Sequence, residues 1–168
     1  NSKQDSPFNI VIKDFDTIVF TYPDGNRDAE ALMVDPNTKD LYILSKRESS
    51  VSIYRLPYPQ STSKVIEAEK LGNFTVSPDK SYRRSDQITA ADISRDGSKI
   101  IIKTYYDMIM LNNLNNSVAS AFSSEQIKLD YITIRGGEAV CWRWDQSGYY
   151  TISEQTDDSP VHLYFYPF

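Results

Sequence analysis

The sequence predicts an all-β protein, a β-propeller of about three four-stranded antiparallel blades. Apolar residues seldom recur at the three- and four-residue spacing of a helix. Short runs rich in Val, Ile, Tyr and Thr instead lie between clusters of Gly, Pro, Asn and Asp, which is typical of strands joined by turns. A stretch near the start of the chain is also repeated near its end, as repeated blades would require.

About twelve short strands are expected, one for each of these runs. The predicted strands are 16–22, 30–35, 40–46, 50–56, 64–72, 88–94, 98–106, 107–113, 126–134, 138–144, 148–154 and 161–167. The predicted turns are Asp24-Gly25, Asp35-Pro36, Asp96-Gly97 and Ser147-Gly148.

The repeat sets the length of the structural unit. "RDAEALMVDPNTKDLYILSK" begins at Arg27, and "RGGEAVCWRWDQSGYYTISE" begins at Arg135, so the two align without a gap at an offset of 108 residues. Glu30 then matches Glu138. A looser copy between them, "ITAADISRDGSKIIIKTYY", carries Asp92 one place out of register. Half the offset is close to the length of a propeller blade, roughly 40 to 50 residues.

The expected organisation is one partial propeller domain over residues 1–168. Its blade cores are predicted at about 27–72, 87–134 and 135–168, and residues 14–22 at the edge of a preceding or closing blade. Propeller rings usually take four to eight blades. We therefore expect another chain, another copy or a missing domain to complete the ring.

Composition limits the partners. The chain has 18 Lys and Arg against 23 Asp and Glu, a formal charge of -5, which argues against binding to nucleic acid. No apolar run approaches the roughly 20 residues of a membrane span. Asn73 and Asn115 begin glycosylation triplets, which favours an extracellular or secreted protein. The single cysteine, Cys141, excludes an internal disulfide.

Three stretches carry a resemblance to a known family: "YPDGNRDAEALMVDPNTKDLYILSKR", "ITAADISRDGSKIIIKTYY" and "GGEAVCWRWDQSGYYTISE". They resemble blade cores in the C-terminal half of a poorly characterised family of secreted, mostly bacterial propellers, similar to the phytase-like and SdiA-regulated propellers. The resemblance covers Thr21 to about Glu154 and implies part of a six-bladed ring. Members of that family usually carry further acidic blade motifs upstream, which this sequence lacks.

Acidic residues of the innermost strands are the candidate site. In a propeller these strands face the central channel, where carboxylates of Glu30, Asp92 and Glu138 could together hold Ca²⁺ through oxygen ligands. The other interpretation makes Arg27, Glu30, Arg135 and Glu138 structural ion pairs, because buried charges need partners. The structural interpretation is preferred, and the metal interpretation is kept open.

Other residues suggest weaker sites. His162 has no Ser-Asp arrangement beside it, and Arg83 and Arg84 are expected in a solvated loop between blades. The strand aromatics are expected to pack within blades, or to stack on a sugar or peptide where they emerge at the channel mouth. These aromatics are Trp142, Trp144, Tyr149 and Tyr150.

Two functions remain. The favoured one is a non-catalytic extracellular or surface module that binds protein or glycan. The alternative is a Ca²⁺-dependent hydrolase of the lactonase or phosphoesterase type, in which the acidic channel residues would act through the cation.

Overall fold

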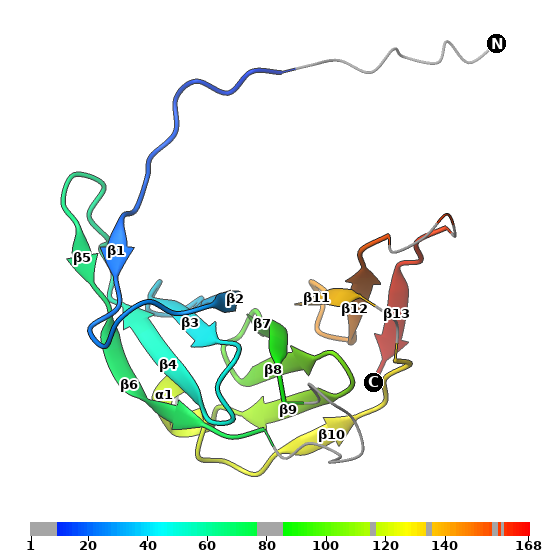
Figure 1. The fold of residues 1–168 in the computed structure, drawn as a ribbon. Helices are drawn as coiled ribbons and strands as arrows, with labels where there is room; N and C mark the ends of the chain where they lie inside the picture. Colours follow the sequence, from blue (N-terminus) through cyan, green and yellow to red (C-terminus); the bar gives the residue numbers. More distant parts are fainter. Residues whose placement is uncertain (1–9, 77–85, 115–116, 134–135, 156–157, 159) are drawn as a thin grey trace.

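The structure, a computed structural model, describes residues 10–76, 86–114, 117–133, 136–155, 158 and 160–168. Three antiparallel sheets follow one another along an arch, and the first strand of each sheet lies on the inner side (Figure 1). This arrangement confirms the predicted all-β fold and its propeller blades.

Each blade is a run of consecutive strands. The first blade contains β2 (Ala29–Val34), β3 (Leu41–Ser45), β4 (Val51–Leu56) and β6 (Glu69–Phe74). The second contains β7 (Ile88–Ile93), β8 (Lys99–Thr104), β9 (Met108–Asn112) and β10 (Ile127–Leu129). The third contains β11 (Gly137–Trp142), β12 (Gly148–Ser153) and β13 (Tyr164–Pro167). Within the described ranges, the third blade therefore has three strands where the others have four.

Alternating side chains of the second blade pack against the blades on its two sides. In β8, Ile100 and Ile102 belong to the apolar core between the first and second blades, whereas Ile101 belongs to the core between the second and third. Because β8 is covered on both faces, its sequence is a continuous apolar run and lacks the polar alternation of a half-exposed strand.

The innermost strand of each blade has a register shift at its start. The residue in the shift is Glu30 in β2, Thr89 in β7 and Glu138 in β11, because the partners of the flanking residues on the neighbouring strand are consecutive. These three residues are structurally equivalent, and a β-bulge of this kind re-aims the side chain at the strand end. We call the end of the inner strands that carries these residues the bulge end.

The opposite ends of the inner strands lead into short turns. We call this end of the inner strands the turn end. An aspartate organises each turn by accepting a hydrogen bond from a backbone N–H two residues on. Asp35 accepts from Asn37, Asp96 from Ser98 and Asp145 from Ser147. This recurrence is the local reason why each inner strand is followed by a tight reversal of the chain.

The segment 14–22, predicted as an edge strand, forms a strand only at β1 (Phe20–Thr21). It pairs in parallel with β5 (Ile66–Glu67), which precedes β6 at the outer edge of the first blade. Phe20 and Tyr22 pack against an apolar cluster that includes Tyr54. Residues 20–22 therefore cover the outer part of the face that a preceding blade would contact.

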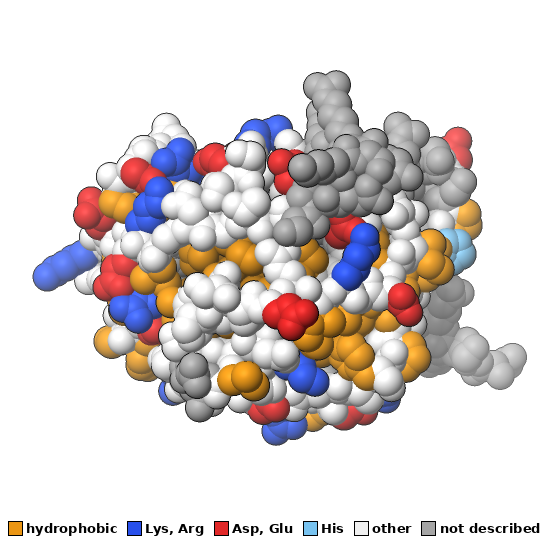
Figure 2. All heavy atoms as spheres, turned by 90° about the horizontal axis from the view of Figure 1, so that it is seen from below, with side chains coloured by type: hydrophobic (Ala, Val, Ile, Leu, Met, Phe, Trp, Pro, Cys, Tyr) orange, Lys and Arg blue, Asp and Glu red, His pale blue; other side chains and the backbone are white. Residues whose placement is uncertain are grey.

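One short helix, α1 (Val118–Ala121), is present in the described part of the chain, and Ser117 caps it by accepting a hydrogen bond from Ser120 N. No helix in those ranges has the length and hydropathy needed to cross a bilayer. Seen from below the view of Figure 1, acidic, basic and hydrophobic side chains are interspersed on the visible face (Figure 2).

Candidate functional site at the two ends of the inner strands

A lysine and a tyrosine connect the first two blades at the bulge end. Lys46 Nζ lies 2.5 Å from Glu30 Oε2 and donates a hydrogen bond to Tyr105 Oη at 2.9 Å. Burial lowers the pKa of Lys46, but its hydrogen bonds to Glu30 and Tyr105 outweigh that effect and leave the pKa raised. Glu30, a predicted metal ligand, is thus engaged by a cation of its own blade.

A second lysine connects the second and third blades. Lys103 is fully buried, and its Nζ donates to the carbonyl oxygens of Thr104 at 2.8 Å and Gly137 at 2.7 Å. The ammonium also lies 4.8 Å from the centroid of the Tyr131 ring. Burial lowers the pKa of Lys103 to about 8, and the charge of Glu138 opposes this shift. Lys103 is therefore a buried cation held mainly by neutral dipoles.

Glu138 lies in the same electrostatic neighbourhood as Glu30. Burial raises the pKa of Glu138; Lys46 and Lys103 oppose the rise, while the charges of Glu30 and Glu154 add to it. The charges of Glu30 and Glu138 therefore interact at the bulge end. Two lysines that the metal interpretation did not include lie beside them.

Asp92 occupies a different place. The bulge position of its blade belongs to Thr89, and Asp92 follows three residues later on the same strand. Its Oδ2 accepts a hydrogen bond from Trp142 N at 2.8 Å, and its backbone oxygen accepts one from Trp142 Nε1 at 3.3 Å. Burial raises the pKa of Asp92, opposed by backbone hydrogen bonds from Trp142 and Ile93. Asp92 therefore links the inner strands of the second and third blades.

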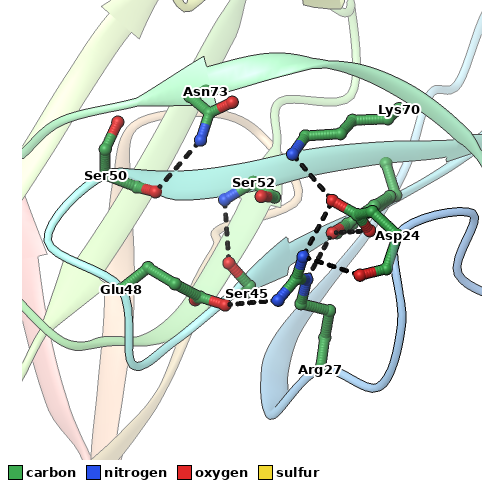
Figure 3. Close-up of polar contacts among 9 residues, drawn as sticks. Asp24, Arg27, Ser45, Glu48, Ser50, Ser52, Lys70 and Asn73 are labelled. Atoms are coloured by element: carbon green, nitrogen blue, oxygen red, sulfur yellow. Dashed lines mark hydrogen bonds and ion pairs between the residues drawn. The ribbon is translucent and has the colours of Figure 1, made fainter.

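Arg27 forms ion pairs, but not with Glu30. Its guanidinium lies 2.8 Å from Asp24 Oδ2 and 3.4 Å from Glu48 Oε1 (Figure 3). Its Nε donates to Tyr54 Oη at 2.8 Å. Asp24 also pairs with Lys70 at 2.7 Å, and hydrogen bonds from Arg27 and Lys70 hold the pKa of Asp24 well below its usual range. The expected pairing of Arg27 with Glu30 is replaced by this cluster, because the turn before β2 brings Asp24 to Arg27.

Asn73 lies on the surface of β6. Its side-chain amide donates to Ser50 O at 3.2 Å (Figure 3). Thr75, the third residue of the triplet, donates from its hydroxyl to Ser50 Oγ at 3.1 Å. Glycosylation of Asn73 stays a prediction.

Four of the residues singled out in the sequence lie outside the described ranges. The four are Arg83, Arg84, Asn115 and Arg135. His162 lies 5.9 Å from Tyr164, measured between ring centroids.

The turn end presents an exposed aromatic ring. Trp144 is 72% exposed, and the Arg95 guanidinium lies 3.7 Å from its ring centroid. Arg95 belongs to the β7–β8 turn and Trp144 to the β11–β12 turn, so neighbouring inner strands present them together. Trp142 and Tyr149, in contrast, are buried in the core between blades.

A metal centre is not assembled by the described residues. No group of three or more His, Cys, Asp and Glu side chains in those ranges lies in a position to hold a metal ion. What the bulge end can do is place alternating charges across two blade junctions, which orients the blades relative to one another.

Sequence reasoning missed Lys46 and Lys103. The detectable signal for Lys103 was its place in "KIIIKT", where it is two residues from Ile101 and therefore faces the same neighbouring blade. A lysine on a face that is otherwise apolar needs a partner, because a buried charge without one is costly.

Comparisons with known proteins support the fold. A hydrazine synthase of Kuenenia stuttgartiensis superposes with a TM-score of 0.54 at 16% identity, over 83% of this chain and 34% of that one. TolB of Acinetobacter baumannii superposes with a TM-score of 0.52 at 14% identity, over 86% of this chain and 31% of that one. A protein from Lactobacillus plantarum superposes with a TM-score of 0.51 at 14% identity, over 82% of this chain and 37% of that one. The fold is a partial β-propeller. This chain spans about a third of the length of those proteins, and no family model and no curated protein matches its sequence.

Proposed function

We propose that the chain is a non-catalytic binding and scaffold module of a propeller, which binds a protein or glycan partner at its turn end in an extracellular or cell-surface setting. The observation that carries the proposal is the exposed indole of Trp144 beneath the Arg95 guanidinium. An indole offers a large rigid surface at low entropic cost, and Trp and Arg are the residues most enriched in binding hot spots.

The placement of these two residues supports this use. Both belong to short turns whose aspartates fix the backbone, and both follow inner strands that are packed between blades. A ligand that stacks on Trp144 would therefore meet a surface that is already ordered, which reduces the entropic cost of binding.

The contacts made by the acidic residues of the inner strands give further support. Glu30 is paired with Lys46, and Asp92 accepts a backbone N–H of the next blade. Each of these interactions engages a carboxylate oxygen in a contact that holds blade residues in place. Their roles in blade packing favour the scaffold function over the hydrolase.

The first prediction concerns Trp144. Replacement of Trp144 by alanine is expected to weaken binding of a captured ligand at least tenfold, about 1.4 kcal/mol, because the stacking surface is lost. The measurement is titration calorimetry after screening a glycan array, including cellohexaose and chitohexaose, and a displayed-peptide library. Val65→Ala is the control, since Val65 is 64% exposed and directly precedes β5 at the outer edge of the first blade. Equal affinities of Trp144→Ala and wild type would refute the assignment of the turn end.

The alternative is a Ca²⁺ site at the bulge end. The observation that favours it is the partly exposed Glu138 carboxyl, whose pKa is raised by burial and by the charges of Glu30 and Glu154, since a cation would relieve that repulsion. With the scaffold function we expect the same melting temperature in excess Ca²⁺ and in chelator. A Ca²⁺-dependent rise in the melting temperature that Glu138→Gln abolishes would instead establish the metal site. Scanning calorimetry on both proteins makes the distinction.

A further inference from the structure

Two further cation–aromatic pairs accompany the one already described at the turn end. In the first blade, Lys39 lies in the β2–β3 turn, and its Nζ is 5.2 Å from the centroid of the Tyr58 ring. In the second blade, Lys99 begins β8 directly after the β7–β8 turn, and its Nζ is 5.5 Å from the centroid of the Phe168 ring. The N–H of Phe168 donates to Ser147 O in the β11–β12 turn. All three inner-strand turns thus contribute to one surface.

The three aromatic rings of this surface are open to solvent. Trp144 is 72% exposed although the Arg95 guanidinium lies over its ring, and Tyr58 and Phe168 are 54% and 59% exposed. The attraction between a cation and a ring face also restrains the long side chain that carries the cation. Each pair therefore offers a ligand a flat apolar surface and a positive charge whose position is already restricted, which lowers the entropic cost of binding.

The three cations have no acidic partner among the described residues. The ion pairs found there involve other cations, and the exposed Arg47, for example, is paired with Asp28. The chain has 23 Asp and Glu against 18 Lys and Arg, so a shortage of acids does not explain why Lys39, Arg95 and Lys99 are left without one. Their charges are available to a ligand.

The acidic residues of the turn end do not neutralise these cations. Asp35 and Asp40 are buried, and Asp145 lies 3.5 Å from the guanidinium of Arg143. Asp96 accepts hydrogen bonds from hydroxyl groups and a backbone N–H of its own turn. The exposed surface of the turn end therefore keeps positive charge beside its aromatic rings.

Neighbouring turns contact one another, which makes the surface continuous across the three blades. A Cβ at Gly97 in the β7–β8 turn would lie 2.3 Å from Asn37 Nδ2 in the β2–β3 turn. The side-chain amide of Gln146, in the β11–β12 turn, donates to Asp96 Oδ1 at 2.9 Å. A ligand longer than one ring therefore meets the three cation–aromatic pairs on one ordered platform.

This chemistry selects a ligand whose carboxylates are spaced along a chain of rings. Carboxylates form charge-assisted hydrogen bonds with guanidinium and ammonium groups, and sugar rings stack on exposed aromatic faces. An extended peptide would need main-chain partners, but the N–H groups of Asn37, Ser98 and Ser147 already donate to aspartates. Three separated cations on a chain of formal charge -5 suit spaced carboxylates better than the dense phosphates of nucleic acid.

We propose that the turn end binds an acidic glycan, a chain of sugar units that carry carboxylates. The sugar ring stacks on Trp144 while a carboxylate pairs with Arg95, and Lys39 and Lys99 bind the carboxylates on either side. This inference rests on the proposed binding function of the turn end and adds that the ligand is recognised by its charge.

Titration calorimetry with matched hexasaccharides tests the requirement for charge. The probes are hexasaccharides of galacturonate, mannuronate and hyaluronan, each compared with the same hexasaccharide after reduction of its carboxylates to primary alcohols. We expect at least one acidic hexasaccharide to bind the full chain roughly tenfold more tightly than its reduced form. No binding by any acidic hexasaccharide, or equal affinities for the acidic and reduced forms, would overturn the inference. Equal affinities that Trp144→Ala weakens would overturn the inference and leave the proposed binding function intact.

Charge-removing variants identify the cations. Arg95→Gln and Lys99→Gln are each expected to weaken binding of the acidic hexasaccharide roughly fivefold and to leave binding of the reduced one unchanged. Arg47→Gln is the matched control, because the side chain of Arg47 is 62% exposed in the β3–β4 turn at the bulge end, and it should bind like wild type. Circular dichroism verifies that each variant is folded. Equal losses in Arg95→Gln and Arg47→Gln would show that overall charge, and not the turn end, attracts the ligand, and would overturn the inference.

A hexaglutamate peptide tests the class of ligand. It carries the same number of carboxylates as hexagalacturonate but no sugar ring, so we expect it to bind at least tenfold more weakly than the acidic hexasaccharide. Hexaglutamate binding as tight as that of the hexasaccharide, and weakened by Arg95→Gln, would replace the acidic glycan by an acidic peptide.

Discussion

Gly148→Ala is expected to lower the free energy of unfolding by about 3 kcal/mol, at the upper end for overpacking of a filled site. A Cβ at Gly148 would lie 2.1 Å from the backbone oxygen of Tyr166 and 2.8 Å from Phe165 Cε2. Gly148 pairs with Pro167 at the start of the β12–β13 ladder, so the neighbouring backbone moves only if that ladder opens. Urea denaturation followed by tryptophan fluorescence gives the measurement.

Gly137→Ala is the matched control for this prediction. A Cβ at Gly137 would meet Tyr131 Oη at 2.6 Å and Lys103 Nζ at 2.8 Å, which are the far ends of long side chains and can shift. We therefore expect a smaller loss for Gly137→Ala than for Gly148→Ala. The explanation by backbone clash would be wrong if the order were reversed.

The second large effect is a dependence of stability on pH caused by Lys103. Burial lowers the pKa of Lys103 from 10.5 to about 8 in the folded protein. Between about pH 8 and 10.5 the unfolded chain therefore binds more protons than the folded one, and stability rises with pH. A shift of this size corresponds to roughly 3 kcal/mol, gained as the folded lysine becomes neutral.

Lys103→Met isolates this contribution. The free energy of unfolding of wild type minus that of Lys103→Met is expected to increase by roughly 2 kcal/mol from pH 7.5 to 10, the part of the full effect that falls in this window. The difference is the quantity to compare, because other groups, such as Tyr149 with its pKa raised to about 12, affect both proteins alike. Parallel stability curves would show that Lys103 is charged in the fold throughout this range.

The strands were predictable where a single pattern controls them. "KIIIKT" forms β8 because a continuous β-branched run suits a strand buried on both faces. The predicted strand 64–72 is divided at Ala68, since β5 pairs with β1 while β6 pairs with β4. Where a strand begins and ends depends on which segment pairs with it, and that information is not contained in the strand's own sequence.

The site was less predictable because it depends on backbone register. The sequence alignment places Asp92 roughly beside Glu30 and Glu138, but the bulge of β7 falls at Thr89. Asp92 lies three residues further along the strand, where its carboxylate meets Trp142 of β11 instead. The matching of Glu30 with Glu138 in the repeat corresponds to the bulge position that both residues occupy in their blades. The partners Lys46 and Lys103 come from other strands, and pairing across blades has no signature in the local sequence.

The two blade junctions differ in their polar links although their apolar layers are alike. Apolar contact alone would allow any blade to pack on any other. At the first junction the ammonium of Lys46 reaches Tyr105, and at the second that of Lys103 reaches the carbonyl of Gly137. A blade docked out of order would remove the acceptor that the neighbouring blade supplies and leave each amine only the partner in its own blade, Glu30 or Thr104, at a cost of about 1.5 to 3 kcal/mol. The lysines thus discriminate the correct sequence of blades during folding from its permutations.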